Sequence, residues 1–185
     1  MQLPALSPLS PLSLVLADIQ KAIEARLYYP ALLATLTIPE ICVALALDNS
    51  VFVKKKHYVD FVDKYTTPRE LGLSGESCYR LRGGVVHRAN MAGHPKFDAT
   101  HVIFTLPESR AHTHAFSIVN EQQQKKAAMF DLEMFYKAMD QAARRWYEDH
   151  QNDPKVAENM KNLIRYSPIG LSPFLNGVPV VGSGI

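Results

Sequence analysis

The sequence is poor in cysteine, the residue that cross-links small folds through disulfides and binds structural metals. Its 185 residues include two cysteines, Cys42 and Cys78, and one tryptophan. Both cysteines lie in apolar segments and neither has a partner at a metal-ligand spacing, which disfavours a disulfide scaffold and a zinc ribbon. We therefore expect two buried thiols in a reducing compartment, and hence a cytoplasmic protein.

An excess of charge of one sign is missing as well. Lys and Arg number 20 against 18 acidic residues, a formal net charge of +2, which excludes a dedicated nucleic-acid coat. Any contact with nucleic acid must therefore be local. No basic residue precedes Lys21, so the apolar start lacks the charged front of a secretory signal.

No uninterrupted apolar run is long enough for a membrane span. The longest candidate, residues 31–47, contains Pro39 and Glu40 and is shorter than the roughly 20 residues that a span requires. We expect no membrane segment. The composition, with 47% apolar and 21% charged residues, is typical of one globular domain.

Hydrophobic periodicity predicts an all-α fold with a small β insertion. Apolar positions recur at helical spacing in six segments, which are 14–29, 31–47, 51–65, 74–90, 126–150 and 154–164. Residues 101–106 and 112–119 are rich in β-branched and aromatic side chains, as in a hairpin. The expected architecture is a bundle of four to five helices with this hairpin before the long late helix.

The ends of the chain are expected to lie outside this bundle. Residues 1–15 are predicted to be a flexible N-terminal arm, and residues 16–165 to be the helical domain. Residues 166–185 hold three prolines and four glycines, so they are predicted to be a coiled C-terminal tail that drapes over the body or a partner.

The most informative segment is the run from Tyr79 to His87, YRLRGGVVH. Gly83 and Gly84 each cost roughly 1 kcal/mol relative to alanine inside a helix, so a close backbone approach is expected there. At 100° per residue, Arg80 and His87 return to nearly the same helix face. The glycines and Glu76 lie along that face, which predicts a groove edged by Glu, Arg and His.

Arg82 is the second candidate arginine. It is five residues from His87, so the two side chains converge only if the helix ends near His87 or a second copy brings the partner across. An imidazole exchanges protons near neutral pH, and a guanidinium binds phosphate with two hydrogen bonds. RNA cleavage by the 2′-hydroxyl without a metal needs both groups.

The motif LRGGVVH resembles the signature of HEPN domains, a helical superfamily with many metal-independent ribonucleases, toxins and phage-defence effectors. The order of the segments ALLATLTIPEIC, YVDFVDKYT, SGESCYRLRGGVVH and FDATHVIFTLP, followed by a long helix, is similar to that of bacterial HEPN-like proteins. The resemblance implies a homodimer in which two Arg/His motifs meet across a two-fold axis and cleave RNA. It implies no metal and no cofactor, and an antitoxin or another protein as a further partner.

Carried over residue by residue, the resemblance assigns catalysis to Arg82 and His87, with Arg80 as the alternative arginine. One residue departs from the family's pattern, since Gly83 follows Arg82 where active members often have Asn, Asp or His. The alternative hypothesis is a non-catalytic HEPN-like module that binds RNA, a nucleotide or a protein partner. Arg144 and Arg145 with His150 also satisfy the motif spacing.

Residues around the motif are candidates for binding the substrate. Tyr79 has a ring that stacks on a base, although an aromatic residue at its spacing is more often part of the core. The basic run Lys54, Lys55 and Lys56 is predicted either to guide an RNA backbone or to be a solvated helix face. The substrate-binding set is completed by Glu76, Gly83 and Gly84, which line the expected groove.

Three histidines form a separate candidate cluster. His112 and His114 lie on one predicted strand and His101 on the preceding one, and alternate strand residues point to one face. A metal site there is geometrically open, but no carboxylate or cysteine stands at a matching position. The preferred interpretation is the polar face of an exposed hairpin, with no bound metal.

Overall fold

The computed structural model describes residue 7 and residues 10–91, 99–110 and 113–184. Its helices are α1 (Pro11–Glu24), α2 (Tyr28–Leu45), α3 (Lys55–Tyr65), α4 (Pro68–Leu71), α5 (Gly75–Arg88), α6 (Leu132–His150) and α7 (Pro154–Met160). Its strands are β1 (His101–Thr105), β2 (Phe116–Asn120), β3 (Lys125–Asp131), β4 (Arg165–Ser167), β5 (Gly170–Leu171), β6 (Leu175–Asn176) and β7 (Val180–Gly182).

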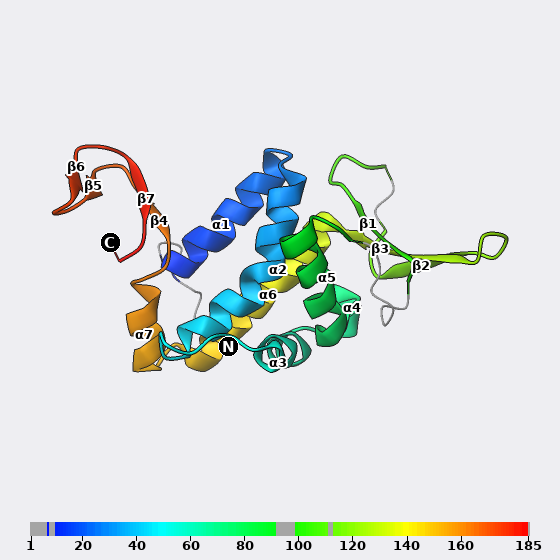
Figure 1. Ribbon diagram of the computed structural model, residues 1–185, viewed down its shortest axis with the longest axis horizontal. Helices are drawn as coiled ribbons and strands as arrows, with labels where there is room; N and C mark the ends of the chain where they lie inside the picture. The colour runs from blue at the N-terminus through cyan, green and yellow to red at the C-terminus, as the bar shows by residue number, and fades with distance from the viewer. Residues whose placement is uncertain (1–6, 8–9, 92–98, 111–112, 185) are drawn as a thin grey trace.

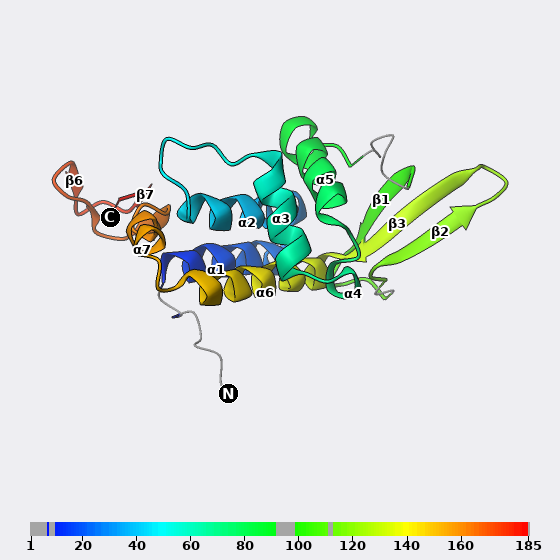
Figure 2. The ribbon, with the colours of Figure 1, turned by 90° about the horizontal axis from the view of Figure 1, so that it is seen from below.

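The helical body is built around α2. Helices α1 and α6 pack along it on one side, and α3 and α5 cross it on the other (Figures 1 and 2). The core contains Tyr58, Phe135 and Met139, all 0% exposed. The Tyr58 hydroxyl donates a 3.0 Å hydrogen bond to the Leu36 carbonyl, which satisfies a polar group that is otherwise expensive to bury.

Among the described residues one helix, α2, is long and apolar enough to cross a membrane by its length and composition. In the fold it is the central helix, with Ala31, Leu36 and Cys42 fully buried among its neighbours. An apolar helix that other helices cover on both sides is typical of a packed core.

The first sheet has the order β1–β3–β2 and projects from one end of the body (Figure 1). Strand β3 is central, since it pairs with β1 in parallel and with β2 in antiparallel orientation. Val102, Ala128 and Phe130 cover the inner face and are buried. At the other end of the molecule, β4 pairs with β7 and β5 with β6 (Figure 1).

The all-α prediction is wrong. The protein is about 52% helical and 16% strand with three small sheets, which makes it a mixed α/β fold. The expected hairpin of residues 101–106 with 112–119 does not form, because β3 lies between β1 and β2. Residues 126–131 were expected to begin the late helix, but they belong to β3, and α6 starts only at Leu132, capped by Asp131.

The ends differ from expectation too. Helix α1 begins at Pro11, within residues 1–15 that are predicted to be a flexible arm, and the Ser10 side chain caps it. The C-terminal tail, predicted to be a coil, forms short strands with many side chains exposed.

The two prolines of α2 do not interrupt it. The helix continues through Pro39 without a break, and Pro30 lies in its first turn, where a missing N–H costs nothing.

Candidate functional site

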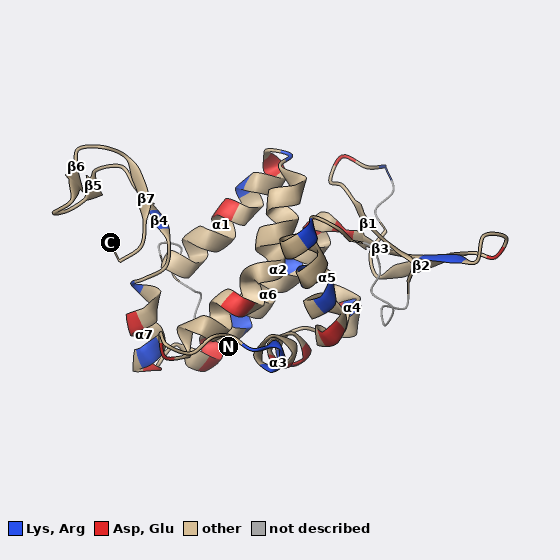
Figure 3. Ribbon diagram, viewed as in Figure 1, with Lys and Arg blue, Asp and Glu red and all other residues tan. Residues whose placement is uncertain are grey.

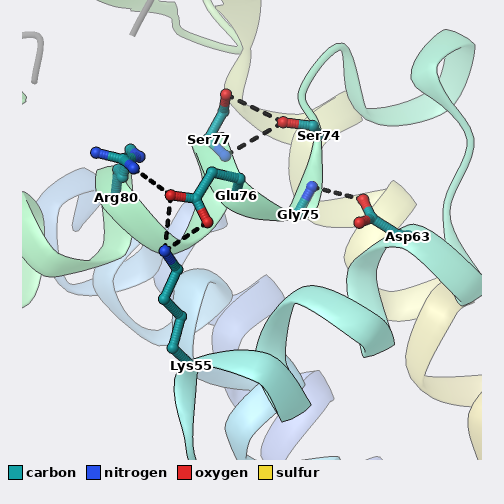
Figure 4. Close-up of polar contacts among 7 residues, drawn as sticks. All are labelled: Lys55, Asp63, Ser74, Gly75, Glu76, Ser77 and Arg80. Carbon is teal, nitrogen blue, oxygen red and sulfur yellow. Dashed lines mark hydrogen bonds and ion pairs between the residues drawn. The ribbon is translucent and has the colours of Figure 1, made fainter. Parts of the chain in front are cut away.

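The N-terminal end of α5 is fixed against α3. Ser74 caps the helix by accepting a 3.3 Å hydrogen bond from the Ser77 N–H, and the Gly75 N–H donates to Asp63 at 2.7 Å (Figure 4). A Cβ atom on Gly75 would lie 2.6 Å from the Val59 carbonyl oxygen. Only glycine permits this approach, so the position sets how closely the two helices pack.

Three candidate residues meet in one ionic cluster near this end. The Lys55 ammonium lies 2.7 Å from the Glu76 carboxylate, and the Arg80 guanidinium contacts the same carboxylate (Figure 4). The hydrogen bond from Lys55, together with that from Arg80, holds the pKa of Glu76 below its ordinary value. Arg80 is therefore held at Glu76, a full helical turn before the motif glycines.

The other residues of the basic run and Tyr79 have mainly structural surroundings. The ring of Tyr79 packs edge-on against Tyr58 with centroids 5.4 Å apart. Lys56 pairs with Asp60 at 2.5 Å. Lys54 is exposed, and its backbone N–H donates to the His57 ring at 3.2 Å. These contacts favour the interpretation of a solvated helix face over an RNA guide.

The C-terminal end of α5 brings Arg82 and His87 together. The Arg82 Nη1 and His87 Nε2 atoms are 3.0 Å apart, and α5 ends one residue after His87, at Arg88. Because a guanidinium only donates, the imidazole accepts at Nε2 and carries its proton on Nδ1 when it is neutral. His87 is exposed, so its ring is accessible to a ligand.

Glu40 of α2 holds the other side of the Arg82 guanidinium. Its Oε2 atom accepts from Arg82 Nη2 at 2.6 Å and from Nε at 3.1 Å. The two side chains are 17% and 21% exposed, so this is a partly buried, charge-assisted pair. Three of the five guanidinium N–H groups are used, which leaves two without a partner among the described residues.

The two motif glycines have different roles. At Gly84 a Cβ atom would lie 2.4 Å from the Asn90 carbonyl oxygen, because the chain turns back over the helix end. The Gly84 carbonyl accepts hydrogen bonds from the Ala89 and Asn90 N–H groups. At Gly83 nothing lies within 4 Å of an added Cβ atom. Gly84 is thus required by the turn after α5, whereas Gly83 leaves open space beside Arg82.

An apolar cleft of about 240 Å³ borders the same end of α5. Val85 and Ala89 form one of its walls, and the aromatic residues Tyr28, Tyr29 and Phe104 contribute others. The Tyr29 hydroxyl approaches the Val85 carbonyl at 3.4 Å, so the ring of Tyr29 lies against α5. A cleft with aromatic walls suits a planar apolar group such as a nucleobase.

The predicted histidine cluster is not assembled. His112 lies outside the described residues, and His101 is exposed on β1. His114 donates from Nε2 to the Glu70 carbonyl at 2.8 Å and accepts at Nδ1 from the Asp131 N–H at 3.3 Å. Both ring nitrogens are therefore occupied, and within the described ranges no group of three or more His, Cys, Asp or Glu side chains could hold a metal ion.

Sequence reasoning missed Glu40, the residue that positions Arg82. One signal was present, because Glu40 is the only charged residue between Tyr28 and Leu45. A lone carboxylate in an apolar helix needs a cationic partner when it is partly buried. Periodicity could not identify that partner, because Arg82 follows 42 residues later.

Comparison of the chain with protein-family models, with curated proteins and with solved structures found no match in any of the three. The resemblance to HEPN domains therefore stays a prediction from the motif. The Glu40–Arg82–His87 cluster is the feature of the structure that bears on its chemistry.

Proposed function

We propose that this protein is a metal-independent endoribonuclease whose site is the Glu40–Arg82–His87 cluster. The observation that carries the proposal is the 3.0 Å contact between Arg82 and the exposed His87 at the end of α5. In this contact a cation that can bind phosphate lies beside a group that can transfer a proton. Attack by a 2′-hydroxyl requires both groups.

The reaction begins when an RNA phosphate binds Arg82 and displaces the imidazole, which frees the lone pair on His87 Nε2. This nitrogen then accepts the proton of the ribose 2′-hydroxyl. The 2′-oxygen then bonds to phosphorus, and the bond from phosphorus to the 5′-oxygen breaks. The products are a 2′,3′-cyclic phosphate and a 5′-hydroxyl, with no water consumed in this step.

Arg82 stabilises the charge that grows on the phosphate oxygens. Two of its N–H groups have no partner among the described residues and match a bidentate phosphate contact, while Glu40 holds the guanidinium plane in place. The aromatic cleft beside Val85 receives a base next to the scissile phosphate. The open space at Gly83 admits the RNA backbone.

The leaving 5′-oxygen needs a proton while His87 is taking one. A second copy of the chain supplies it, as the homodimer implied by the motif requires, with its own His87 in the protonated form. Cleavage thus needs one imidazole in the neutral form and the other in the protonated form, so the proposal predicts a bell-shaped pH dependence of cleavage.

The test is cleavage of labelled single-stranded RNA in the presence of EDTA. We expect wild-type cleavage, loss of at least about a hundredfold in His87→Ala and Arg82→Ala, and a smaller loss in Glu40→Gln. Arg80→Ala tests the alternative arginine. The matched control is the double variant Arg144→Ala, His150→Ala, which removes another Arg/His pair within the allowed motif spacings and should cleave normally.

Two results would rule out the proposed ribonuclease activity. One is wild-type protein that binds RNA without cutting it at any pH, which would establish the non-catalytic binding module instead. The other is cleavage that persists unchanged in His87→Ala. The Arg82→Ala variant leaves Glu40 partly buried and unpaired, which can disturb the fold. Circular dichroism therefore compares this variant with Arg82→Lys, which keeps the charge but loses the bidentate geometry.

A further inference from the structure

The middle of the outer face of the first sheet is apolar, with His101 and Lys125 at its ends. In the strand register Ile103 pairs with Met129, Phe116 also pairs with Met129, and Ile118 pairs with Ala127, so these side chains share one face. The opposite face carries the buried residues that pack on the body. Ile103, Phe116 and Ile118 are 41%, 53% and 47% exposed. A sheet with one solvated face normally presents polar residues there.

Within the part of the chain that the structure describes, no further strand lies beside β2 at the edge of this sheet. Strand β2 is an outer strand, and all five of its residues are exposed. None of them is charged or a proline. An outer strand carries unpaired N–H and C=O groups, and proteins usually protect such edges with charge, proline or a bulge. We call the apolar face together with the β2 edge the sheet surface.

A second exposed apolar surface lies at the other end of the molecule. Residues 164–182, called the arm from here on, contain β4 to β7 and project away from the helices (Figures 1 and 2). From residue 166 onward the sequence has no charged residue (Figure 3). The exposed large apolar side chains of the arm are Ile164, Tyr166, Ile169, Phe174, Leu175, Val178 and Val181, from 46% to 83% exposed.

The size of the arm fits a protein interface. Seven large side chains, each about half exposed or more, offer on the order of 800 Å² of apolar surface, which is the area that each partner of a standard interface buries. Isolated exposed apolar residues need no explanation, but this much exposed apolar surface on one short segment is typical of an interaction site.

We propose that the arm of one copy packs on the sheet surface of a second copy, and that the exchange is reciprocal. A copy cannot bring its own arm to its own sheet surface, because the two lie at opposite ends of the helical body (Figures 1 and 2). Both surfaces are apolar, and the arm adds strand segments of its own that complement an open strand edge.

A second copy of the chain is a better partner for the arm than a lipid surface. Peripheral membrane segments combine apolar side chains with Lys and Arg that face anionic lipid, and the arm has no basic residue after Arg165. A reciprocal exchange closes the assembly as a two-fold dimer, so that no sheet surface stays exposed.

The experiment measures mass by light scattering over a wide concentration series, without RNA, so its outcome does not depend on cleavage. Wild type is expected to be a dimer. The arm variant Ile169→Lys, Phe174→Lys and the sheet variant Phe116→Lys, Ile118→Lys should each be monomeric. The control Phe52→Lys changes an exposed apolar residue outside both surfaces, at 89% exposure, and should remain dimeric.

Mixing the two variants tests the contact itself. The arm variant keeps its sheet surface and the sheet variant keeps its arm, so the mixture should form a 1:1 dimer with one of the two contacts restored. A monomeric wild type, a dimeric sheet variant, or a mixture that stays monomeric overturns the proposal. If the monomeric wild type also sediments with phosphatidylcholine vesicles, a lipid surface is the partner instead.

Should a lysine variant fail to fold, a cross-link measures the same contact. Ile118→Cys on one chain and Phe174→Cys on another are mixed and treated with a bismaleimide, while the native Cys42 and Cys78 are buried. Cross-linked dimers are expected from the mixture and not from either chain alone. Absence of cross-links in the mixture overturns the contact.

Discussion

The neighbouring glycines Gly83 and Gly84 give a sharp prediction, because alanine at these two positions should change stability in opposite directions. At Gly83 an added Cβ atom meets nothing within 4 Å, so alanine gains about 0.5–1 kcal/mol of helix propensity. At Gly84 the added atom would lie 2.4 Å from the Asn90 carbonyl oxygen, and backbone has to move.

The cost at Gly84 follows from what that movement breaks. The turn after α5 depends on the Ala89 and Asn90 N–H groups, both of which bond to the Gly84 carbonyl. Overpacking of this kind costs about 1–3 kcal/mol, from which the same propensity gain is subtracted. The two variants should therefore differ by about 1–3 kcal/mol in the free energy of unfolding.

Urea unfolding of wild type, Gly83→Ala and Gly84→Ala measures this difference from the midpoints at constant m value. For a chain of this size each kcal/mol corresponds to about 2–4 °C in Tm, so a thermal melt resolves it too. Equal shifts of the two variants in the same direction would refute the reasoning. A stabilised Gly83→Ala that cleaves RNA more slowly would further indicate that the RNA backbone approaches Gly83.

Three further predictions concern stability and reactivity. The hydrogen bond from Arg145 holds the pKa of Glu70 below its ordinary value, so this carboxylate stabilises the fold above the unfolded pKa, and the benefit disappears as pH falls through the lowered value. Glu70→Gln should cost less than about 1 kcal/mol at neutral pH and nothing at strongly acidic pH in unfolding titrations. Burial raises the pKa of the Cys42 and Cys78 thiols, so both should react with a colorimetric disulfide reagent only after unfolding. The Asn159 amide donates to two carbonyls at the end of α2, at 3.0 and 2.8 Å, so Asn159→Ala should lower the unfolding free energy in urea by about 1–2 kcal/mol.

Local signals in the sequence identified α5 and its surroundings well. The helix predicted over residues 74–90 is present, Ser74 caps it, and Cys78, Leu81 and Val85, which recur at helical spacing, are buried. Helical spacing and capping act within a few residues, so one sequence is enough to recognise them. The close approach expected at the glycines also exists, although at Gly84 the approaching backbone is the chain's own.

Tertiary pairing could not be predicted in the same way. The segment KKAAMFD of β3 contains helix-forming Lys, Ala and Met, and its strand conformation depends on pairing with β1 and β2. The parallel pairing with β1 joins residues more than twenty positions apart, which no local period encodes. The contact of Glu40 with Arg82 is equally non-local, so the sequence identified the motif but not the residue that holds its arginine.

The central claim is that His87 and Arg82 cleave RNA by 2′-hydroxyl attack. The most direct measurement is mass spectrometry of the product ends after RNA is incubated with the protein in EDTA. We expect 2′,3′-cyclic phosphate and 5′-hydroxyl ends with wild type and intact RNA with His87→Ala. Products with 5′-phosphate ends, or cyclic ends formed equally well by His87→Ala, would contradict it.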